Sequence, residues 1–544
     1  MENQNKYNQG RKYGNSEELS IVKQLKKEAI NYKQAHNKDL LDDLQANILK
    51  HHKKEHVEYH FLKFKSKEKE KAVLFVEEVG KKITTALEHI EDRKKPILSM
   101  YLTYSGYTFF DIPPTIIPED IAFRSSIKER TMLSQEDIVK EYQKEEDFEV
   151  IIMYACDKED LAESLNGLVW KKELEKEYKK LSFIEKKHTE YGHLKNPLKD
   201  DDFKFKDGIS NPSFFPGTSK REKIISNQVK KSDLSSLDIV LTRDKGGSKE
   251  ISCGSYGAFA KFKINEDSID NLVKKIVEKT GMEKELAAAN IIGRFKDGTP
   301  LTLSGKPKKY PTNNFNYDEL IKQKRTKIAQ TDEEGLRCPF HTHIRKANPR
   351  TEHTKNKAIV RRGVYYGKKE EKDKGILFFS FQNSLSNQFE YVLNHWMLDK
   401  YTVTKDEDGI DQLKEDGRDI LFCQPGDVYT IPSEWNLSET STIKKTAITI
   451  EAADRMVSFQ GGIYFFAPCK SFFNKIFAYN TTLLKRRHKD LLAKKNLQSV
   501  PVGYPAFNKE TEVKLNAKQL EEKGDIKFNF GTMVSLNQKE EENA

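Results

Sequence analysis

The sequence is poor in cysteine, in tryptophan and in long hydrophobic runs. Its 544 residues include only 5 cysteines and 3 tryptophans. The cysteines are widely spaced, form no CxxC pair and are odd in number, which argues against a disulfide framework or a cysteine-based zinc site and favours free thiols in a reducing compartment. No apolar run approaches the ~20 residues of a membrane span, and the N-terminus shows no secretion signal. We therefore expect a cytoplasmic chain without a membrane span.

Charge of one sign is also not concentrated anywhere. The 94 basic and 84 acidic residues give a net charge of +10, but both kinds are spread along the chain. This pattern indicates a solvated, Lys-rich surface and predicts no nucleic-acid partner. In contrast, 31 Phe and 22 Tyr can build sizeable cores, and the length favours two domains plus tails over a single core.

Hydrophobic spacing alternates between strand and helix periods, and the same rhythm occurs in both halves of the chain. It predicts strands at 56–65, 96–110, 148–157, 254–264 and 375–383, and helices at 71–90, 158–178, 268–281 and 384–401. The fold class is therefore α+β, with two halves that each contain a sheet with helices on one face.

Composition also suggests where these halves begin and end. A polar stretch near residues 220–240 separates them, residues 1–40 are Lys- and Asn-rich, and the chain ends in a charged segment. We predict a polar tail at 1–40, an N-terminal domain at 41–225, a C-terminal domain at 226–505 and a charged segment at 506–544.

One segment of chemical interest is FKFKDGISNP (203–212). Asp-Gly followed by Asn-Pro is typical of a tight turn, and the plain interpretation makes Asp207 a turn-capping residue. The tetrapeptide FKDG occurs again around Asp297, so by itself it identifies no site.

Two later segments concentrate histidine and arginine. CPFHTHIRKANPR (338–350) contains His341 and His343 but no third ligand at a usual zinc spacing. A histidine followed by arginines could instead supply an iron ligand and cations for the propionates of a haem. IVRRGVYYG (359–367) opens an apolar strand with two arginines, which is costly unless they meet an anion, a polar ligand or a surface salt bridge.

Taken together, these segments resemble the dye-decolourising peroxidase family, in particular its larger, elaborated branch. FKFKDGISNP is similar to the family's distal GxxDG motif, CPFHTHIRKANPR to its proximal-histidine segment and IVRRGVYYG to its distal-arginine strand. Further matches follow in the family's order between about residues 40 and 475, namely DLQANILK, GSYGAFAKF, GRFKDGTPLTLS, QNSLSNQFEYV, YTIPSEWN and GGIYFFAPCKSFF.

The resemblance implies two ferredoxin-like domains, with haem b bound in the C-terminal half. His343, not His341, matches the axial iron ligand, and Asp207, not Asp297, matches the distal acid–base residue because only Asp207 is followed by Asn-Pro. Arg361, the first arginine of its pair, matches the distal arginine. The first glycine of GxxDG is replaced by Lys204, which changes the backbone freedom at the start of the loop.

The remaining cofactor contacts are predicted with less support from the motifs. Arg345 and Arg350 are the candidates for the haem propionates, and Ile376 and Phe378 are further cofactor-binding candidates on the strand at 375–383. The resemblance implies that a carboxylate orients His343, although the sequence does not identify it.

The expected activity is reduction of hydrogen peroxide coupled to oxidation of an organic reductant such as a dye or phenol. Asp207 would relay a proton and Arg361 would stabilise developing charge. Because an unperturbed Asp has a pKa of about 3.9, we expect an acid-shifted pH optimum. Trp170, Trp396 and Trp435 are possible electron relays, or ordinary packing residues.

Two other functions fit parts of the same pattern. A protein that stores, senses or delivers haem would keep His343 without needing Asp207 and Arg361 together. A haem-free α+β interaction module would need none of the three. The sequence specifies no oligomeric state.

Overall fold

The structure is a computed structural model. It describes residues 30, 35–144, 147–157, 182–198, 205–206, 208–215, 236–317, 331–350, 352–405, 411–432 and 447–479. All of them belong to one compact unit that extends to Tyr479. The predicted helix at 158–178, residues 220–235 of the polar stretch near 220–240 and the charged C-terminal segment lie outside the described residues. The predicted division of the chain into four segments stays a prediction.

The strands of the N-terminal half form a ferredoxin-like sheet. Their spatial order is β4-β1-β3-β2, with antiparallel pairing throughout. The elements are β1 (His56–Phe64), α3 (Lys69–Lys81), β2 (Ile97–Leu102), β3 (Val150–Cys156) and β4 (Ile184–His193).

The C-terminal half repeats this arrangement. Its strands follow the order β14-β6-β9-β8, so the first strand along the chain again lies between the last and the third. The elements are β6 (Cys253–Ile264), α11 (Glu266–Thr280), β8 (Val364–Tyr366), β9 (Gly375–Gln382) and β14 (Val457–Ala467). The predicted α+β class with two ferredoxin-like halves is confirmed.

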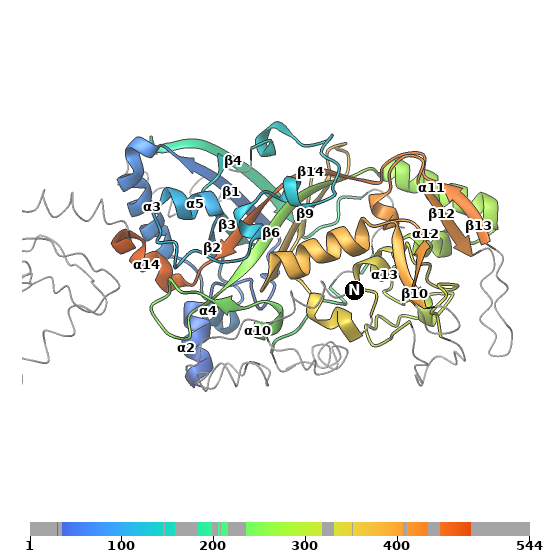
Figure 1. Ribbon diagram of the computed structural model, residues 1–544, viewed down its shortest axis with the longest axis horizontal. Coiled ribbons are helices and arrows are strands. Elements are labelled where there is room, and N and C mark those ends of the chain that lie inside the picture. Colours follow the sequence, from blue (N-terminus) through green and yellow to red (C-terminus); the bar gives the residue numbers. More distant parts are fainter. Residues whose placement is uncertain are drawn as a thin grey trace, which may run out of the picture. The chain divides into compact units, whose positions relative to one another are not determined.

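The two sheets join edge to edge into a closed ring of strands (Figure 1). Each junction rests on a single residue pair, Phe466↔Leu102 between β14 and β2 and His193↔Tyr365 between β4 and β8. Gln45, from the DLQANILK segment, reinforces the first junction. Its side-chain amide donates to the carbonyls of Met100 and Pro468, both at 2.7 Å, and accepts from the Met100 N–H.

The interior of the ring is filled by aromatic side chains from both halves. Tyr59 stacks on Phe379 with ring centroids 5.2 Å apart, and Phe465 lies 4.7 Å from Phe379 and 4.8 Å from Tyr101. All four side chains are fully buried. Because side chains alternate along a strand, the residues between these positions face outward. On β9, Leu377, Phe379 and Phe381 therefore face the core, and Ile376 and Phe378 face away from it.

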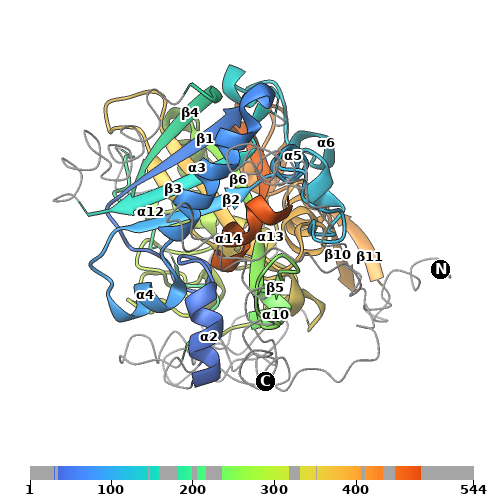
Figure 2. The ribbon, with the colours of Figure 1, turned by 90° about the vertical axis from the view of Figure 1, so that its left-hand side faces the viewer.

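The remaining elements surround this ring. Helices α3 and α14 pack together on the N-terminal half, which faces the viewer in Figure 2, and α11, α12 and the β12–β13 hairpin lie at the opposite end in Figure 1. They are α2 (Ala35–Asp43), α4 (Ala86–Glu91), α5 (Tyr104–Phe109), α6 (Ile127–Arg130), α10 (Ser236–Ile239), α12 (Lys284–Ile292), α13 (His343–Ala347), α14 (Lys470–Tyr479), β5 (Thr242–Arg243), β7 (Val360–Arg361), β10 (Tyr401–Lys405), β11 (Asp411–Glu415), β12 (Val428–Pro432) and β13 (Ala447–Glu451).

Two predicted elements were wrong in extent. The expected helix at 71–90 is two helices, because Thr85 starts α4 with a capping box in which it and Glu88 bond each other's backbone N–H groups. The expected strand at 96–110 ends at Leu102. Thr103 then caps α5 by accepting from the Gly106 N–H at 3.0 Å, and Gly106 lies so close to β3 that an added Cβ would meet the Glu149 carbonyl oxygen at 2.1 Å.

The predicted helix at 384–401 is helical but wound unusually. Its segments η8 (Leu385–Phe389) and η9 (Val392–Met397) are π-helical. Such turns are rare and occur mostly near functional sites, and η9 packs against α13, the helix that begins with His343.

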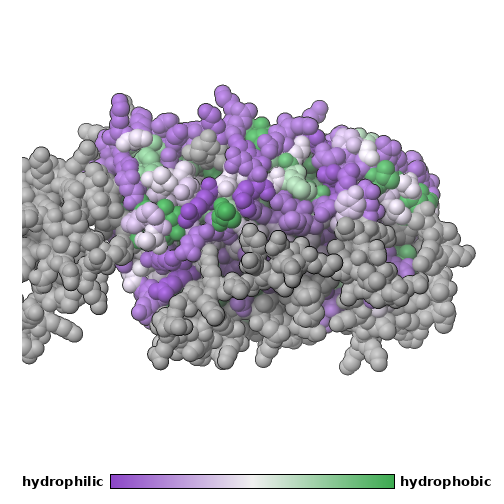
Figure 3. All heavy atoms as spheres, in the orientation of Figure 1, coloured by the Kyte–Doolittle hydropathy of each residue, from purple (hydrophilic) through white to green (hydrophobic). Residues whose placement is uncertain are grey.

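The surface agrees with the charge pattern of the sequence. Hydrophilic residues dominate the described surface in Figure 3, with only small separate hydrophobic areas. Within the described ranges, no helix is both long and apolar enough to span a lipid bilayer. All five cysteines are described, and none forms a disulfide bond.

Candidate active site

His343 has the geometry of a metal-ligating imidazole. It opens α13, and its Nδ1 lies 2.7 Å from the Oδ2 atom of Asp419, which is completely buried. The His343 side chain is 28% exposed, and its Nε2 has no hydrogen-bond partner among the described residues. A carboxylate that accepts from Nδ1–H leaves the Nε2 lone pair available for a metal and makes the imidazole a stronger donor.

Asp419 is the partner that the sequence did not reveal. It lies 76 residues from His343, at the start of a 3-10 turn, where its Oδ1 accepts from the Leu421 N–H at 3.0 Å. Its own N–H donates to the Met397 carbonyl at 2.7 Å, at the end of η9. The π-helix, the turn and the proximal histidine are therefore joined by one chain of hydrogen bonds.

His341 has a different environment. Its ring packs edge-on against Tyr429 with centroids 5.1 Å apart, and only 2% of the residue is exposed. Burial, together with nearby Lys346, lowers the pKa of His341 to about 3. It is a packed core histidine, and across the described part of the chain no three His, Cys, Asp or Glu side chains converge as metal ligands.

His341 should therefore weaken the fold in acid. In the unfolded chain its pKa is about 6.5. Between pH 6.5 and 3 the imidazole therefore binds a proton in the unfolded state but not in the folded state. The stability due to the neutral ring is complete above pH 6.5 and is lost as pH falls. We expect the difference in unfolding free energy between His341→Phe and wild type to change by about 1.4 kcal/mol per pH unit between pH 6 and 4. Urea unfolding at several pH values measures this, and a constant difference would contradict it.

The two neighbouring arginines of the third motif point to different places. The Arg362 guanidinium donates to the carbonyls of Asn47 (2.6 Å), Ile48 (2.8 Å) and Arg361 (2.9 Å) and is 3% exposed. Burial lowers its pKa to about 9. The Arg361 side chain lies on the opposite face of the strand, where its NH2 donates to the Ser210 hydroxyl at 2.8 Å. Only Arg361 reaches the loop of the first motif.

That loop, residues 205–215, holds the predicted acid–base residue. Asp207 and Lys204 lie outside the described residues, but the positions next to Asp207 are fixed. The Lys206 N–H donates to the Lys296 carbonyl at 3.1 Å, and Gly208 has φ +77°, the left-handed region that favours glycine. The described parts of this loop are therefore held by the 295–298 turn at Lys206 and by Arg361 at Ser210.

Asp297, in the second FKDG, caps its own turn. Its Oδ1 accepts from the Thr299 N–H at 2.8 Å, and its Oδ2 accepts from the Lys309 N–H at 2.5 Å. Both carboxylate oxygens are thus engaged by the backbone, as the plain turn interpretation of an Asp-Gly pair predicts.

Most of the donor groups of Arg345 are engaged by protein partners, so few of them are left to bind a haem propionate. Its NH1 donates to the Cys338 carbonyl at 2.8 Å and lies 3.4 Å from an Asp332 oxygen, while its NH2 donates to the Glu333 carbonyl at 3.0 Å. The guanidinium also lies over the rings of Tyr317 (4.1 Å) and Phe340 (4.2 Å). The geometry therefore gives no support to Arg345 as a propionate ligand and shows instead a residue that holds the segment before His343.

Arg350 and Arg294 form a cationic pair. Arg350 donates to Asn313 and to the Phe315 carbonyl, and its buried Nε has no partner among the described residues. Arg294 donates to the Gly298 and Thr312 carbonyls and to the Asn313 side chain. Burial and the charge of Arg350 lower the pKa of Arg294 to about 9, and Arg361 contributes to this shift.

Neither arginine of this pair contacts a carboxylate among the described residues. A buried cation and a partly buried one that share one amide oxygen indicate an anionic ligand. Sequence reasoning missed Arg294 because it lies 49 residues before His343 in a different motif, GRFKDGTPLTLS.

Ile376 and Phe378 share a sheet face with Arg361. Val360 and Phe381 are opposite each other and belong to the core, so Arg361 and its partner Ser380 face outward together with Phe378 and Ile376. Phe378 contacts Phe262 and Phe389, at centroid distances of 6.3 and 5.9 Å.

Of the three tryptophans, only Trp396 is among the described residues. It lies in η9 beside Tyr391, with ring centroids 5.5 Å apart. Trp170 and Trp435 lie outside the described residues.

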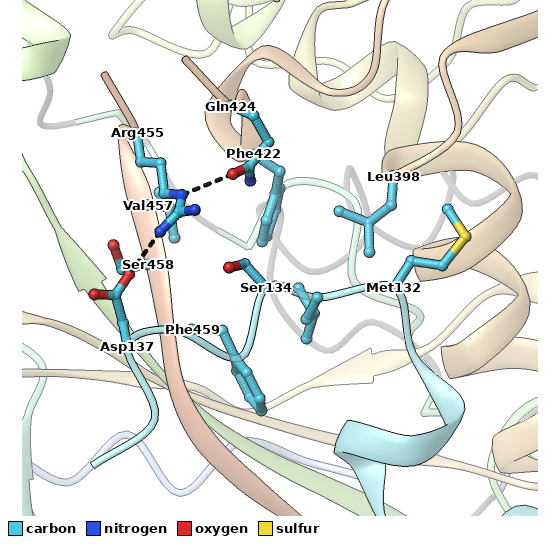
Figure 4. Close-up of a pocket in the computed structure, with 11 residues that line it drawn as sticks. Met132, Ser134, Asp137, Leu398, Phe422, Gln424, Arg455, Val457, Ser458 and Phe459 are labelled. Carbon is cyan, nitrogen blue, oxygen red and sulfur yellow. Dashed lines mark hydrogen bonds and ion pairs between the residues drawn. The ribbon is translucent and has the colours of Figure 1, made fainter.

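A small hollow opens between the loop after α6, η9 and β14 (Figure 4). Leu398, Phe422 and Phe459 line it, and Arg455 at its edge bonds Gln424 at 2.7 Å and Asp137 at 3.2 Å. Its cavity volume of about 10 Å³ holds one water molecule. It is too small for an aromatic substrate.

Fold and site together define a class: a pair of ferredoxin-like domains with a carboxylate-backed histidine and a separate strand arginine that is held by a loop from the other half. Comparisons agree. The family described as Dyp-type peroxidase, C-terminal, matches residues 203–415. The multifunctional dye peroxidase DyP2 of Amycolatopsis is 26% identical over 482 residues, covering 80% of this chain and 96% of that protein.

Solved structures match over a similar length. A DyP-type peroxidase of Anabaena has a TM-score of 0.69 and 26% identity, covering 84% of this chain and 99% of that one. A fungal DyP-type peroxidase from Auricularia auricula-judae, at 17% identity and a TM-score of 0.60, shares the fold over 80% of this chain and 98% of its own. This chain is therefore similar to the dye-decolourising peroxidases over most of its length.

Proposed function

We propose that this protein is a haem-dependent peroxidase that reduces hydrogen peroxide and oxidises organic substrates such as dyes or phenols. The observation that carries the proposal is the attachment of Arg361 to the loop of Asp207 through Ser210 and Asn211. A protein that only stored or sensed haem would need His343 but would have no use for a cation fixed beside a carboxylate loop.

The cofactor we propose is haem b. His343 supports it because its Nδ1 is held by Asp419 while Nε2 is available, and Arg350 supports it because a buried guanidinium nitrogen has no partner in the described part of the chain. We assign His343 to the iron, Arg350 and Arg294 to the propionates, and Ile376 and Phe378 to the apolar face. The bound haem would supply an iron centre that accepts and returns electrons.

The chain's own residues would handle protons and charge. Asp207 takes a proton from one peroxide oxygen and delivers it to the other, which departs as water. Arg361, permanently cationic, stabilises the negative charge that develops as the O–O bond breaks. Asp419 keeps the Nδ1 proton of His343 in place, so that Nε2 stays a donor.

This function is tested by adding haemin to the purified protein and then one equivalent of hydrogen peroxide. We expect a Soret band on the first addition and a rapid spectral change on the second, fastest in mild acid. Asp207→Asn should keep the Soret band and slow the peroxide reaction by about 10²- to 10⁴-fold, the usual range for loss of a general acid–base group. A wild type that binds haemin but does not react with peroxide would favour haem storage, and one without a Soret band would favour the interaction module.

We place the protein in the cytoplasm. None of its five cysteines forms a disulfide bond and all five are buried, which is the pattern of a reducing compartment.

A further inference from the structure

The side chain of Asn211 binds both backbone groups of Arg361. Its Oδ1 accepts from the Arg361 N–H at 3.1 Å, and its Nδ2 donates to the Arg361 carbonyl at 3.3 Å. The same Oδ1 lies 3.5 Å from the Arg361 Nε. One amide therefore contacts the arginine at its backbone and at its side chain.

These contacts occupy an open strand edge. On one side β7 pairs with β9, where the Arg362 N–H donates to the Phe379 carbonyl at 2.6 Å. Because successive backbone groups of a strand point to opposite sides, the N–H and C=O of Arg361 point away from β9. Asn211 takes the place that a further strand would occupy, and it does so with a side chain from the other half of the fold.

Asn211 also belongs to a loop whose described residues are bonded to two other parts of the fold. Ser210 and Asn211, three and four positions after Asp207, supply every contact described for the loop with Arg361. On the other side of Asp207, Lys206 is bonded to Lys296. Lys206 is thus held by Lys296, and Ser210 and Asn211 are held by Arg361.

We propose that Asn211 is a positioning residue for the peroxide reaction: it holds the backbone and the guanidinium of Arg361 in place, so that the cation is fixed where negative charge develops on the substrate. The inference rests on the proposed peroxidase function. The alternative is that Asn211 only stabilises a turn, as Asn before Pro often does.

Three variants distinguish these roles. Asn211→Ala removes both amide contacts, and Asn211→Gln keeps both amide groups on a longer stem. Asn265→Ala is the matched control, since Asn265 also uses its side-chain amide twice, accepting from the Ser268 N–H and donating to Asp454 at the start of α11.

The rate constant for the reaction with peroxide is measured by stopped flow, and cyanide affinity is measured on the resting ferric protein. We expect Asn211→Ala to lower the rate constant about 10- to 100-fold, the scale of a displaced catalytic group. Its cyanide Kd should rise several-fold, while its Soret intensity and its KM for the organic reductant stay as in wild type. Asn211→Gln should recover much of the rate, and Asn265→Ala should keep the wild-type rate and cyanide Kd, because it removes only a helix cap.

The inference fails if Asn211→Ala reacts with peroxide and binds cyanide like wild type, or if it loses no more than Asn265→Ala does. If Asn211→Ala does not fold, the same criteria are applied to Asn211→Gln. A rate constant for peroxide below that of Asn265→Ala then supports the inference. A wild type that binds haem but does not react with peroxide would overturn the peroxidase function. In that case an unchanged cyanide Kd in the variants overturns the positioning role, and a raised Kd supports it.

Discussion

Replacing Arg361 with Ala is expected to slow the reaction with hydrogen peroxide by about 10²- to 10³-fold, equivalent to about 3–4 kcal/mol, the usual effect of removing one preorganised charge-stabilising donor. Its guanidinium is already held by Ser210 and Asn211, so little reorganisation is needed when charge develops. Stopped-flow mixing with peroxide measures the rate, and the Soret band reports whether haem is still bound.

Two further variants separate charge from geometry. Arg361→Lys keeps the charge but not the planar fork of donors, so it should recover only part of the rate. Arg455→Ala removes an arginine that contacts Gln424 and Asp137 and not the residues around Arg361. This variant should react with peroxide as wild type does. A wild-type rate in Arg361→Ala would refute the role given to this residue.

Replacing Asp419 with Asn is expected to lower the peroxide rate about 10- to 100-fold, as is typical when the carboxylate behind a metal-bound histidine is lost. The substitution keeps the shape and one acceptor oxygen, which can stay with His343 Nδ1–H at the position of Oδ2 while the contact of Oδ1 with the Leu421 N–H is lost, and it removes the negative charge. The imidazole then donates less electron density, so the reduction potential of the haem iron should become more positive.

Spectroelectrochemical titration and stopped flow together test this expectation. Asp137→Asn, which removes a surface carboxylate that contacts Arg455, is the matched control and should change neither quantity. An Asp419→Asn protein with the potential and rate of wild type would show that the 2.7 Å contact with His343 has no role in the chemistry.

The sequence alone could not show which of the two arginines faces the site. That depends on which face of the strand is buried, and the neighbouring strands decide it. From sequence, Arg361 and Arg362 differ only in their match to a motif. In the fold, the pairing of Val360 with Phe381 inside the core sends Arg361 outward to the loop and Arg362 to the carbonyls of Asn47 and Ile48. Arg361 therefore contacts the loop through Ser210, and its role as the distal arginine stays a prediction.

Local sequence patterns predicted the helices and strands correctly where local interactions determine them. Period-two and helical spacing located β1, β3, β6, β9 and α11 closely, since burial of one face sets those periods. It failed at 96–110, where a Thr cap and the close approach of Gly106 to Glu149 end the strand, and at 71–90, where Thr85 starts a second helix. Both are decided by a few side-chain hydrogen bonds or contacts within a continuous apolar run.

By itself the sequence indicated the resemblance to the family, the repeated α+β halves and the candidates His343, Asp207 and Arg361, because order and motif residues lie along the chain. Only the tertiary structure decided the closure of the two sheets into a ring, the Asp419 partner of His343, the pairing of Arg294 with Arg350 and the engagement of Arg345 by Asp332. Each of these contacts joins residues that are distant in sequence, or involves a side chain for which several partners compete. Such choices depend on which surfaces meet when the chain packs, and local spacing carries no record of them.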